Sequence, residues 1–94
     1  GSIATTKKVY IGRVLNYYKK SKIAFVRAEA DSLAAGDLIY IIGSTTGVVE
    51  LKLNKIIQDD IELNSVNKGN DFTFECKELV RANDRVYKIV SVVE

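Results

Sequence analysis

The sequence contains no histidine and no proline, and its only cysteine is Cys76. Without histidine, a Cys/His zinc site and a histidine-based catalytic triad are excluded, and one cysteine cannot make a disulfide framework. No apolar run approaches the roughly 20 residues that a membrane-spanning helix needs. The lack of disulfides favours a reducing compartment. We therefore expect a cytoplasmic protein with no membrane association, no metal and no cofactor.

The chain has 94 residues, which is long enough for one hydrophobic core. Gly1-Ser2 looks like a cloning remnant, and we predict that residues 1–8 are a disordered lead-in. Residues 9–94 are predicted to form a single domain. We expect this domain to be a monomer.

Short runs of alternating apolar and polar residues, separated by turns, predict strands rather than helices. Residues 9–18 and 23–28 predict a hairpin, and Gly12 within its first strand predicts a bulge or a close backbone contact. Residues 54–64 also allow a partly helical segment. The pattern as a whole is typical of an all-β barrel. The predicted core consists of Val14, Ala24, Val26, Leu33, Ile39, Ile41, Val49, Leu51, Phe72, Phe74, Val86 and Ile89. Cys76 shares a face with Phe72 and Phe74, so a buried thiol is expected.

Three turns carry residues that tolerate a left-handed backbone. Gly36-Asp37 precedes one strand, Asn83-Asp84 precedes another in a similar pattern, and Gly69 centres a third turn. Asp37 and Asp84 could form a catalytic carboxylate pair, but in repeated turn units we expect them at separate corners of the barrel. We predict that each carboxylate accepts hydrogen bonds from local turn amides.

Charge is distributed unevenly along the chain. Residues 1–27 hold seven basic side chains and no acidic one, whereas the remaining residues have a net charge of minus five. The predicted hairpin therefore resembles an RNA-facing edge, in which lysines neutralise phosphates and tyrosine rings stack on bases. The alternative is a solvated hairpin whose lysines only keep it soluble. The candidate RNA-binding residues are Arg13, Tyr17, Tyr18, Lys19, Lys20, Lys22 and Arg27.

A cluster of acidic residues is the other polar feature of the sequence. Asp59, Asp60 and Glu62 lack the periodic spacing and closing glutamate of a calcium loop, so a solvated loop is expected there. No residue pattern predicts catalysis by this chain alone.

The ordered motifs of the chain resemble a known family. They are Gly12-x-Val14, Leu33-x-x-Gly36-Asp37-x-Ile39-x-Ile41-x-Gly43, Val49-x-x-x-Leu53, Lys68-Gly69-x-Asp71 and Val80-Arg81-x-x-Asp84-x-Val86-Tyr87. Together they resemble the second domain of elongation factor Tu, and more closely the elongation-factor-like barrel proteins and the C-terminal barrel of collagenase-like peptidases. The resemblance implies a closed, six-stranded Greek-key barrel of the translation-protein type.

The resemblance also bears on function. The chain lacks the phosphate-loop motif of a GTPase, and the catalytic domain of collagenase-like peptidases lies outside the resemblance. Because several members of that family are associated with RNA modification, the resemblance implies a non-catalytic accessory barrel that contacts tRNA or ribosomal RNA. The alternatives are a docking or spacer domain that packs on a catalytic domain of the parent protein, and a stand-alone elongation-factor-like protein.

Overall fold

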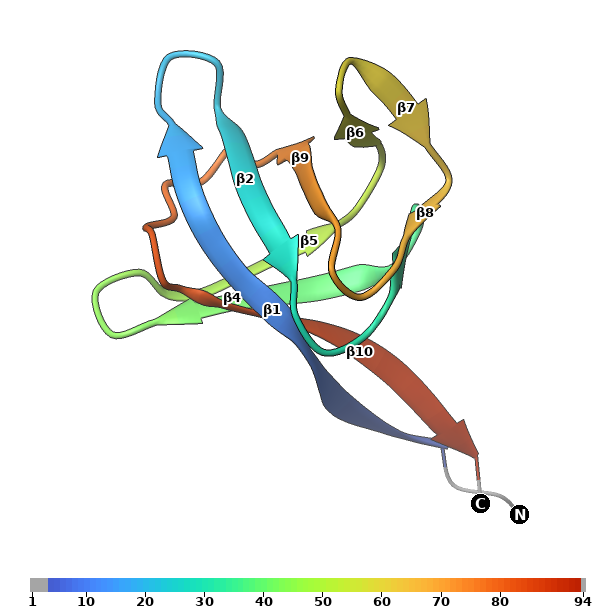
Figure 1. The fold of residues 1–94 in the computed structure, drawn as a ribbon. Coiled ribbons are helices and arrows are strands. Elements are labelled where there is room, and N and C mark those ends of the chain that lie inside the picture. Colours follow the sequence, from blue (N-terminus) through green and yellow to red (C-terminus); the bar gives the residue numbers. More distant parts are fainter. Residues whose placement is uncertain (1–3, 94) are drawn as a thin grey trace.

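The computed structural model describes residues 4–93, which fold into ten strands with no helix (Figure 1). This confirms the all-β prediction, and the described residues therefore include no helix that could cross a membrane. The strands are β1 (Ala4–Tyr18), β2 (Ile23–Ala28), β3 (Leu33–Ala34), β4 (Leu38–Gly43), β5 (Gly47–Lys52), β6 (Ile56–Gln58), β7 (Ile61–Leu63), β8 (Ser65–Val66), β9 (Asp71–Glu75) and β10 (Arg85–Val93).

Eight strands form one curled antiparallel sheet in the order β5-β4-β10-β1-β2-β9-β6-β7, and β3 pairs separately with β8. The strand count exceeds the predicted six because several strands are only two or three residues long. In residues 4–93, the sheet ends β5 and β7 do not pair with each other. The closed Greek-key barrel therefore stays a prediction.

The segment between β5 and β8 is a short hairpin rather than a helix. β6 pairs with β7 through Gln58 and Ile61, so only Asp59 and Asp60 form the turn. Both residues have positive φ angles, 51° and 65°, which is the backbone of a type I′ hairpin turn. The helical alternative for residues 54–64 is therefore wrong, because these two residues reverse the chain before a helical turn can form.

A two-stranded ribbon projects from the body of the domain at the end opposite the β1–β2 tip (Figure 1). β1 pairs with β10 from Ala4 and Val93 inward, so residues 4–8 are strand and not the predicted lead-in. The predicted cloning remnant, Gly1-Ser2, lies outside the described residues. β4 pairs with β10 only as far as Lys88, and β2 pairs with β1 only from Gly12. Residues 4–8 and 89–93, here called the terminal ribbon, therefore have no third strand within residues 4–93.

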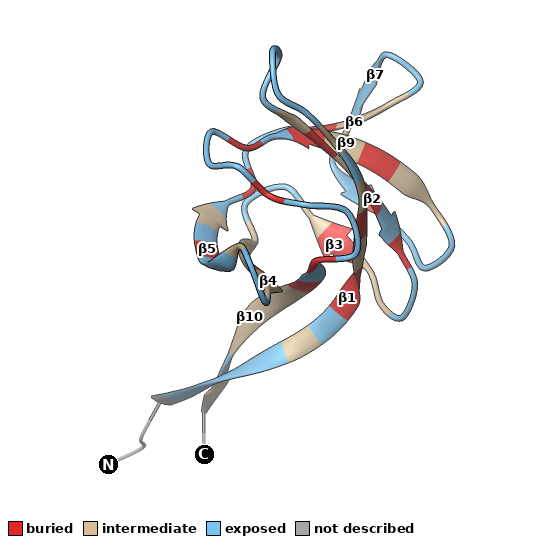
Figure 2. Ribbon diagram, turned by 90° about the vertical axis from the view of Figure 1, so that its left-hand side faces the viewer, coloured by how far each residue is buried: buried red, intermediate tan, exposed pale blue. Residues whose placement is uncertain are grey.

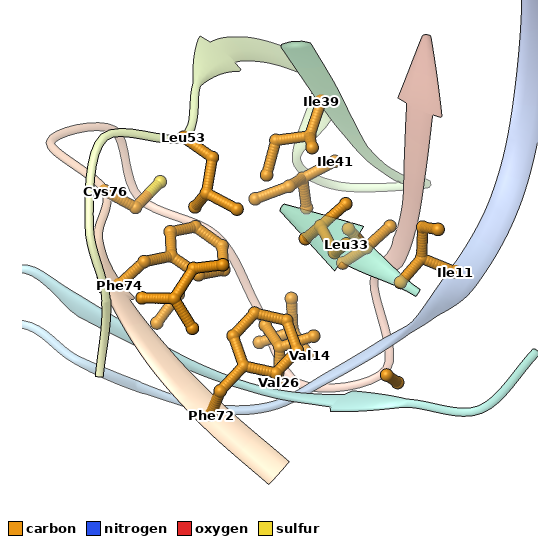
Figure 3. Close-up of a cluster of buried hydrophobic side chains, with 14 of the residues drawn as sticks. Ile11, Val14, Val26, Leu33, Ile39, Ile41, Leu53, Phe72, Phe74 and Cys76 are labelled. Carbon is orange, nitrogen blue, oxygen red and sulfur yellow. The ribbon is translucent and has the colours of Figure 1, made fainter. Parts of the chain in front are cut away.

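The core lies inside the curl of the sheet (Figure 3). Phe72 and Phe74 stack with ring centroids 6.0 Å apart, and the buried Cys76 lies on the same face, as predicted. Ten of the twelve predicted core residues are buried, whereas Leu51 and Ile89 are only half-buried. The prediction missed further core residues from the bulge in β1, from the short strands β6 and β8, and from segments between strands: Ile11, Ile56, Val66, Leu53 and Val80.

The two errors in the predicted core have local causes. Leu51 lines an open pocket together with residues 75–78, so part of its side chain faces solvent, whereas Val49 on the same strand is buried. Ile89 lies in the terminal ribbon, and it is an odd number of residues from the buried Val86, so it points to the opposite face of the sheet. Figure 2 shows the contrast between the buried residues of the body and the exposed and half-buried residues of the ribbon.

Gly12 lies at a β-bulge and makes a close backbone contact, as predicted. The pairing of β1 with β10 changes register between Tyr10 and Gly12. A Cβ atom at Gly12 would collide with the backbone carbonyl of Arg27 on β2. The bulge therefore depends on glycine because the neighbouring strand occupies the space of a side chain.

Candidate contact surface

The tip of the β1–β2 hairpin presents three exposed lysines: Lys19, Lys20 and Lys22. These three residues are here called the tip lysines. Among residues 4–93, none of them makes an ion pair. The turn is closed by the backbone amide of Lys22, which donates to the carbonyl of Tyr18 at 2.8 Å. The side chain of Tyr18 is 47% exposed beside the turn.

The two arginines predicted for the same surface lie elsewhere and are paired with acids. Arg13 is opposite Arg27, which is four positions along β2 from Ile23 of the tip pair Tyr18 and Ile23, or about 13 Å. Arg27 donates two hydrogen bonds to the Asp71 carboxylate, at 2.7 and 3.0 Å. These bonds lower the pKa of Asp71 below its ordinary value.

Arg13 is also neutralised. Its guanidinium lies 3.5 Å from the Glu29 carboxylate and donates to the side-chain oxygen of Asn83 at 2.9 Å. Of the seven predicted RNA-binding residues, the two arginines are therefore ion-paired and lie away from the turn of the tip. Sequence reasoning missed this because Asp71 lies 44 residues from Arg27 along the chain.

Tyr17 belongs to the core boundary. Its ring packs against the buried cluster, and its hydroxyl donates to the carbonyl of Cys76 at 2.7 Å. Burial raises the pKa of the Tyr17 phenol above its ordinary value. In this position Tyr17 covers one end of the core, which leaves Tyr18 as the exposed aromatic residue beside the tip lysines.

A row of three tyrosines crosses the outward face of the sheet, here called the tyrosine row. Tyr10 on β1 is directly opposite Tyr87 on β10, which is directly opposite Tyr40 on β4. Side chains of directly opposite residues lie on the same face of a sheet. The rings of Tyr10 and Tyr87 meet edge to face, with centroids 5.7 Å apart and an interplanar angle of 65°.

Polar contacts hold the tyrosine row in place. The hydroxyl of Tyr10 donates to Glu29 at 2.9 Å, and burial together with this hydrogen bond raises the pKa of Tyr10. The ammonium of Lys8 lies 5.1 Å from the centroid of the Tyr87 ring, within the range of a cation–π contact. The sequence contained these tyrosines, but only the strand register shows that they are adjacent.

The two Asp turns share one hydrogen-bond pattern. The amide of Ala34 donates to Asp37 Oδ2 at 2.8 Å, and the amide of Arg81 donates to Asp84 Oδ2 at 2.9 Å. In each turn the backbone amide of the Asp also donates to the carbonyl of the residue that bonds its side chain, Ala34 or Arg81, at 3.1 Å. The residue before each Asp has a positive φ, 97° at Gly36 and 74° at Asn83.

The environments of the two aspartates differ. Asp84 is buried, at 6% exposure, and it also accepts a hydrogen bond from the hydroxyl of Thr46, whereas Asp37 is half-buried. Gly69 forms the third turn with a φ of 95°, and its amide donates to the carbonyl of Ala28 at 2.6 Å. The carboxylates of Asp37 and Asp84 and the amide of Gly69 therefore each form a hydrogen bond with the backbone at a turn.

Metal-binding groups are sparse. Residues 4–93 contain no cluster of three or more His, Cys, Asp or Glu side chains that could hold a metal ion. Asp59 and Asp60 are exposed turn residues. The thiol of Cys76 donates to the carbonyl of Glu78 at 3.2 Å, and burial raises its pKa, which disfavours the reactive thiolate.

The chain is similar in sequence to part of several proteins that are named as proteases. It is 39% identical, over 99% of its length, to an uncharacterized protease from Methanocaldococcus jannaschii. It is 34% identical, over 94% of its length, to a collagenase from Porphyromonas gingivalis. Its homologues are collagenase-like and protease-like proteins. The chain spans 23% and 21% of the lengths of these two relatives, and no family model matches it.

A solved structure has the same fold. The C-terminal domain of a U32 peptidase candidate from Geobacillus thermoleovorans superposes with a TM-score of 0.79 at 22% identity. The match covers 85% of this chain and 91% of that one. A selenomethionine variant of that domain gives a TM-score of 0.76. The predicted likeness to collagenase-like peptidases is confirmed, whereas the likeness to elongation factor Tu stays a resemblance.

Proposed function

We propose that this chain is a non-catalytic accessory domain of a larger protein of the U32 peptidase type, and that it packs on a neighbouring domain of that protein. Two observations support the accessory role. The chain shares its fold with a domain that lies at the C-terminus of a U32 peptidase candidate. It also matches less than a quarter of each protease relative, which leaves most of each relative's length for catalysis.

The tyrosine row carries the packing proposal. Tyrosine and arginine are enriched among the residues that dominate protein interfaces, because tyrosine covers a large area with few rotatable bonds. Tyr10 is 37% exposed, and Tyr40 and Tyr87 are half-buried, so the row offers aromatic surface to a partner. Edge-to-face packing, the bond to Glu29 and the Lys8 ammonium fix the rings of Tyr10 and Tyr87 before binding. A preorganised surface loses little entropy on association.

A domain graft tests the packing proposal. The matched 95-residue segment of the Methanocaldococcus jannaschii protease would be replaced by this chain, and unfolding of the graft would be compared with that of the isolated domain. If the domain packs on its neighbour, it unfolds at a higher temperature in the graft. Replacing Tyr10 and Tyr87 with Ser should remove that increase. The matched control, Tyr18→Ser, changes an exposed tyrosine off the row and should preserve it.

The result that would contradict the packing proposal is equally direct. If the domain unfolds at the same temperature in the graft and in isolation, no neighbour stabilises it. If Tyr18→Ser removes the increase as fully as the tyrosine-row variants do, the packing surface is not the tyrosine row.

RNA contact is the second candidate function, and the tip lysines favour it. All three are exposed and without an ion pair in residues 4–93, and the exposed ring of Tyr18 lies beside them. Such a tip can neutralise phosphates and stack on an unpaired base. Arg13 and Arg27 are not part of this candidate surface because acids already pair with them.

Salt-dependent titration tests RNA contact. Labelled tRNA and a ribosomal RNA stem-loop would be titrated at several salt concentrations. Changing the three tip lysines to Ser should flatten the log–log salt slope by about two, at about 0.7 per single-strand phosphate contact. A matched control removes the same charge from exposed lysines elsewhere and should leave the slope near its original value: Lys52, Lys55 and Lys77. Equal slopes for the two triple variants, or no binding at low salt, would refute tip-mediated contact.

A further inference from the structure

The terminal ribbon leaves one edge of β10 open and unprotected. β4 stops pairing with β10 at Lys88, so, in the described part of the chain, the backbone of residues 89–93 has a strand partner only on the β1 side. An open strand edge presents unpaired amide and carbonyl groups that can template another strand. Natural proteins usually blunt such an edge with charge, proline or a bulge. The five residues here, Ile89-Val90-Ser91-Val92-Val93, contain none of these.

Charged residues near this edge are directed elsewhere. Lys88, the last residue before the open edge, donates to the carbonyl of Ser32 at 2.9 Å. Lys8, opposite Ile89, lies over the ring of Tyr87. The other edge of the ribbon, on β1, carries the exposed Lys7 and is therefore blunted. The two edges of one ribbon thus differ: one is charged, and the other is uncharged and apolar.

We propose that the open β10 edge pairs with the same edge of a second copy of this chain, antiparallel and centred on Ser91. The sequence of the edge is nearly palindromic about that residue. A two-fold axis at Ser91 places it opposite Ser91 of the second copy, Val90 opposite Val92, and Ile89 opposite Val93. Every apolar residue then meets an apolar residue, as an isologous interface requires. This dimer replaces the monomer expected from the sequence.

Charge and closure are consistent with this register. In the resulting strand order β1-β10-β10-β1, Lys7 lies in the row of Thr5 of the second copy, and Lys8 lies in the row of Ala4. Equivalent lysines of the two copies are then roughly 15–20 Å apart, beyond the Debye length of about 8 Å, so they repel little. Because each outer β1 edge of the four-stranded sheet carries Lys7, the sheet stops at two copies.

Cysteine cross-linking tests the register. Opposite residues of an antiparallel pair have Cα atoms about 4.5–5.5 Å apart, which suits a disulfide. Under oxidised glutathione, Ser91→Cys should convert most chains to a disulfide-linked dimer. The matched control is Thr6→Cys, since Thr6 is exposed, lies directly opposite Ser91 within one chain, and belongs to the blunted edge. It should remain close to the background of the unmodified chain, whose Cys76 is buried.

Introducing a charged residue tests the interface without covalent cross-linking. Light scattering after size exclusion should give twice the 10.4 kDa mass of one chain as concentration rises. Ser91→Lys places like charges directly opposite each other across the two-fold axis and should restore the single-chain mass. Thr6→Lys adds the same charge at the same level of the ribbon and should leave the dimer intact.

Three results would overturn the proposal. One is a single-chain mass at every concentration, which would leave the edge to a strand of a neighbouring domain. Another is an equal disulfide yield for Ser91→Cys and Thr6→Cys. The third is an equal response of the dimer to Ser91→Lys and Thr6→Lys.

Discussion

Removing the carboxylate of Asp84 should destabilise the domain far more than removing that of Asp37, although the two turns have the same hydrogen-bond pattern. In Asp84→Ala, the Arg81 amide and the Thr46 hydroxyl both lose their acceptor within a buried site. A buried donor without a partner costs about 1–3 kcal/mol. Two such donors therefore predict a loss of about 2–6 kcal/mol.

The same change at Asp37 should cost about 0.5–1.5 kcal/mol. The Asp37 carboxylate accepts a hydrogen bond from one donor, the backbone amide of Ala34. Because Asp37 is half-buried, water can replace the carboxylate as the acceptor of that amide. Asp84→Asn is the matched control for the buried turn. Both donors bond to the one oxygen Oδ2, so an amide oxygen in that place can still accept both.

Urea unfolding followed by far-ultraviolet circular dichroism measures these differences from the shift of the midpoint at constant slope. For a domain of this size, a loss of 1 kcal/mol lowers the melting temperature by roughly 4–8 °C. We therefore expect Asp84→Ala to melt at least about 8 °C lower than the parent. The reasoning would be refuted if Asp84→Ala cost no more than Asp37→Ala, or if Asp84→Asn cost as much as Asp84→Ala.

Three further predictions follow from single residues. Gly12→Ala should destabilise by about 1–3 kcal/mol, because its Cβ collides with the Arg27 carbonyl; an unchanged urea midpoint would contradict the bulge contact. Ile41→Ala should cost about 2–5 kcal/mol, whereas Ile61→Ala, at a 62% exposed position, should stay within about 0.5 kcal/mol; equal costs would contradict the assigned core. The Cys76 thiol has a raised pKa in the folded state, so the stability it contributes is present below its unfolded pKa of about 8.5 and is lost as pH rises through the folded pKa. A disulfide reagent at pH 8 should modify it only as fast as the domain unfolds; immediate modification would contradict its burial.

Much of the fold could be predicted from local patterns. Ala24, Val26, Phe72 and Phe74 alternate with more exposed residues, and all four are buried as predicted. A period of two places alternate side chains on one face of a strand, whatever its neighbours are. Ile89 shows the limit of that method. Its residue type suits a core, but its position relative to Val86 and the absence of a third strand leave it half-buried.

Predicting the candidate surfaces required knowledge of contacts between residues that are far apart in the sequence. The exposed tip lysines were expected because four polar residues link two apolar runs. Composition alone could not show that Asp71 pairs with Arg27 or that Glu29 lies beside Arg13. The tyrosine row requires three strands that are far apart in sequence to become neighbours in one register.

The sequence by itself determined the strand-rich architecture, the positions of the turns and the buried face of most strands, because alternation and positive-φ residues act within a few neighbouring positions. Only the tertiary structure decided which charges are neutralised, which tyrosines are adjacent and which edge of β10 is open. These properties depend on the order and register of strands, which are set by the packing of residues far apart along the chain.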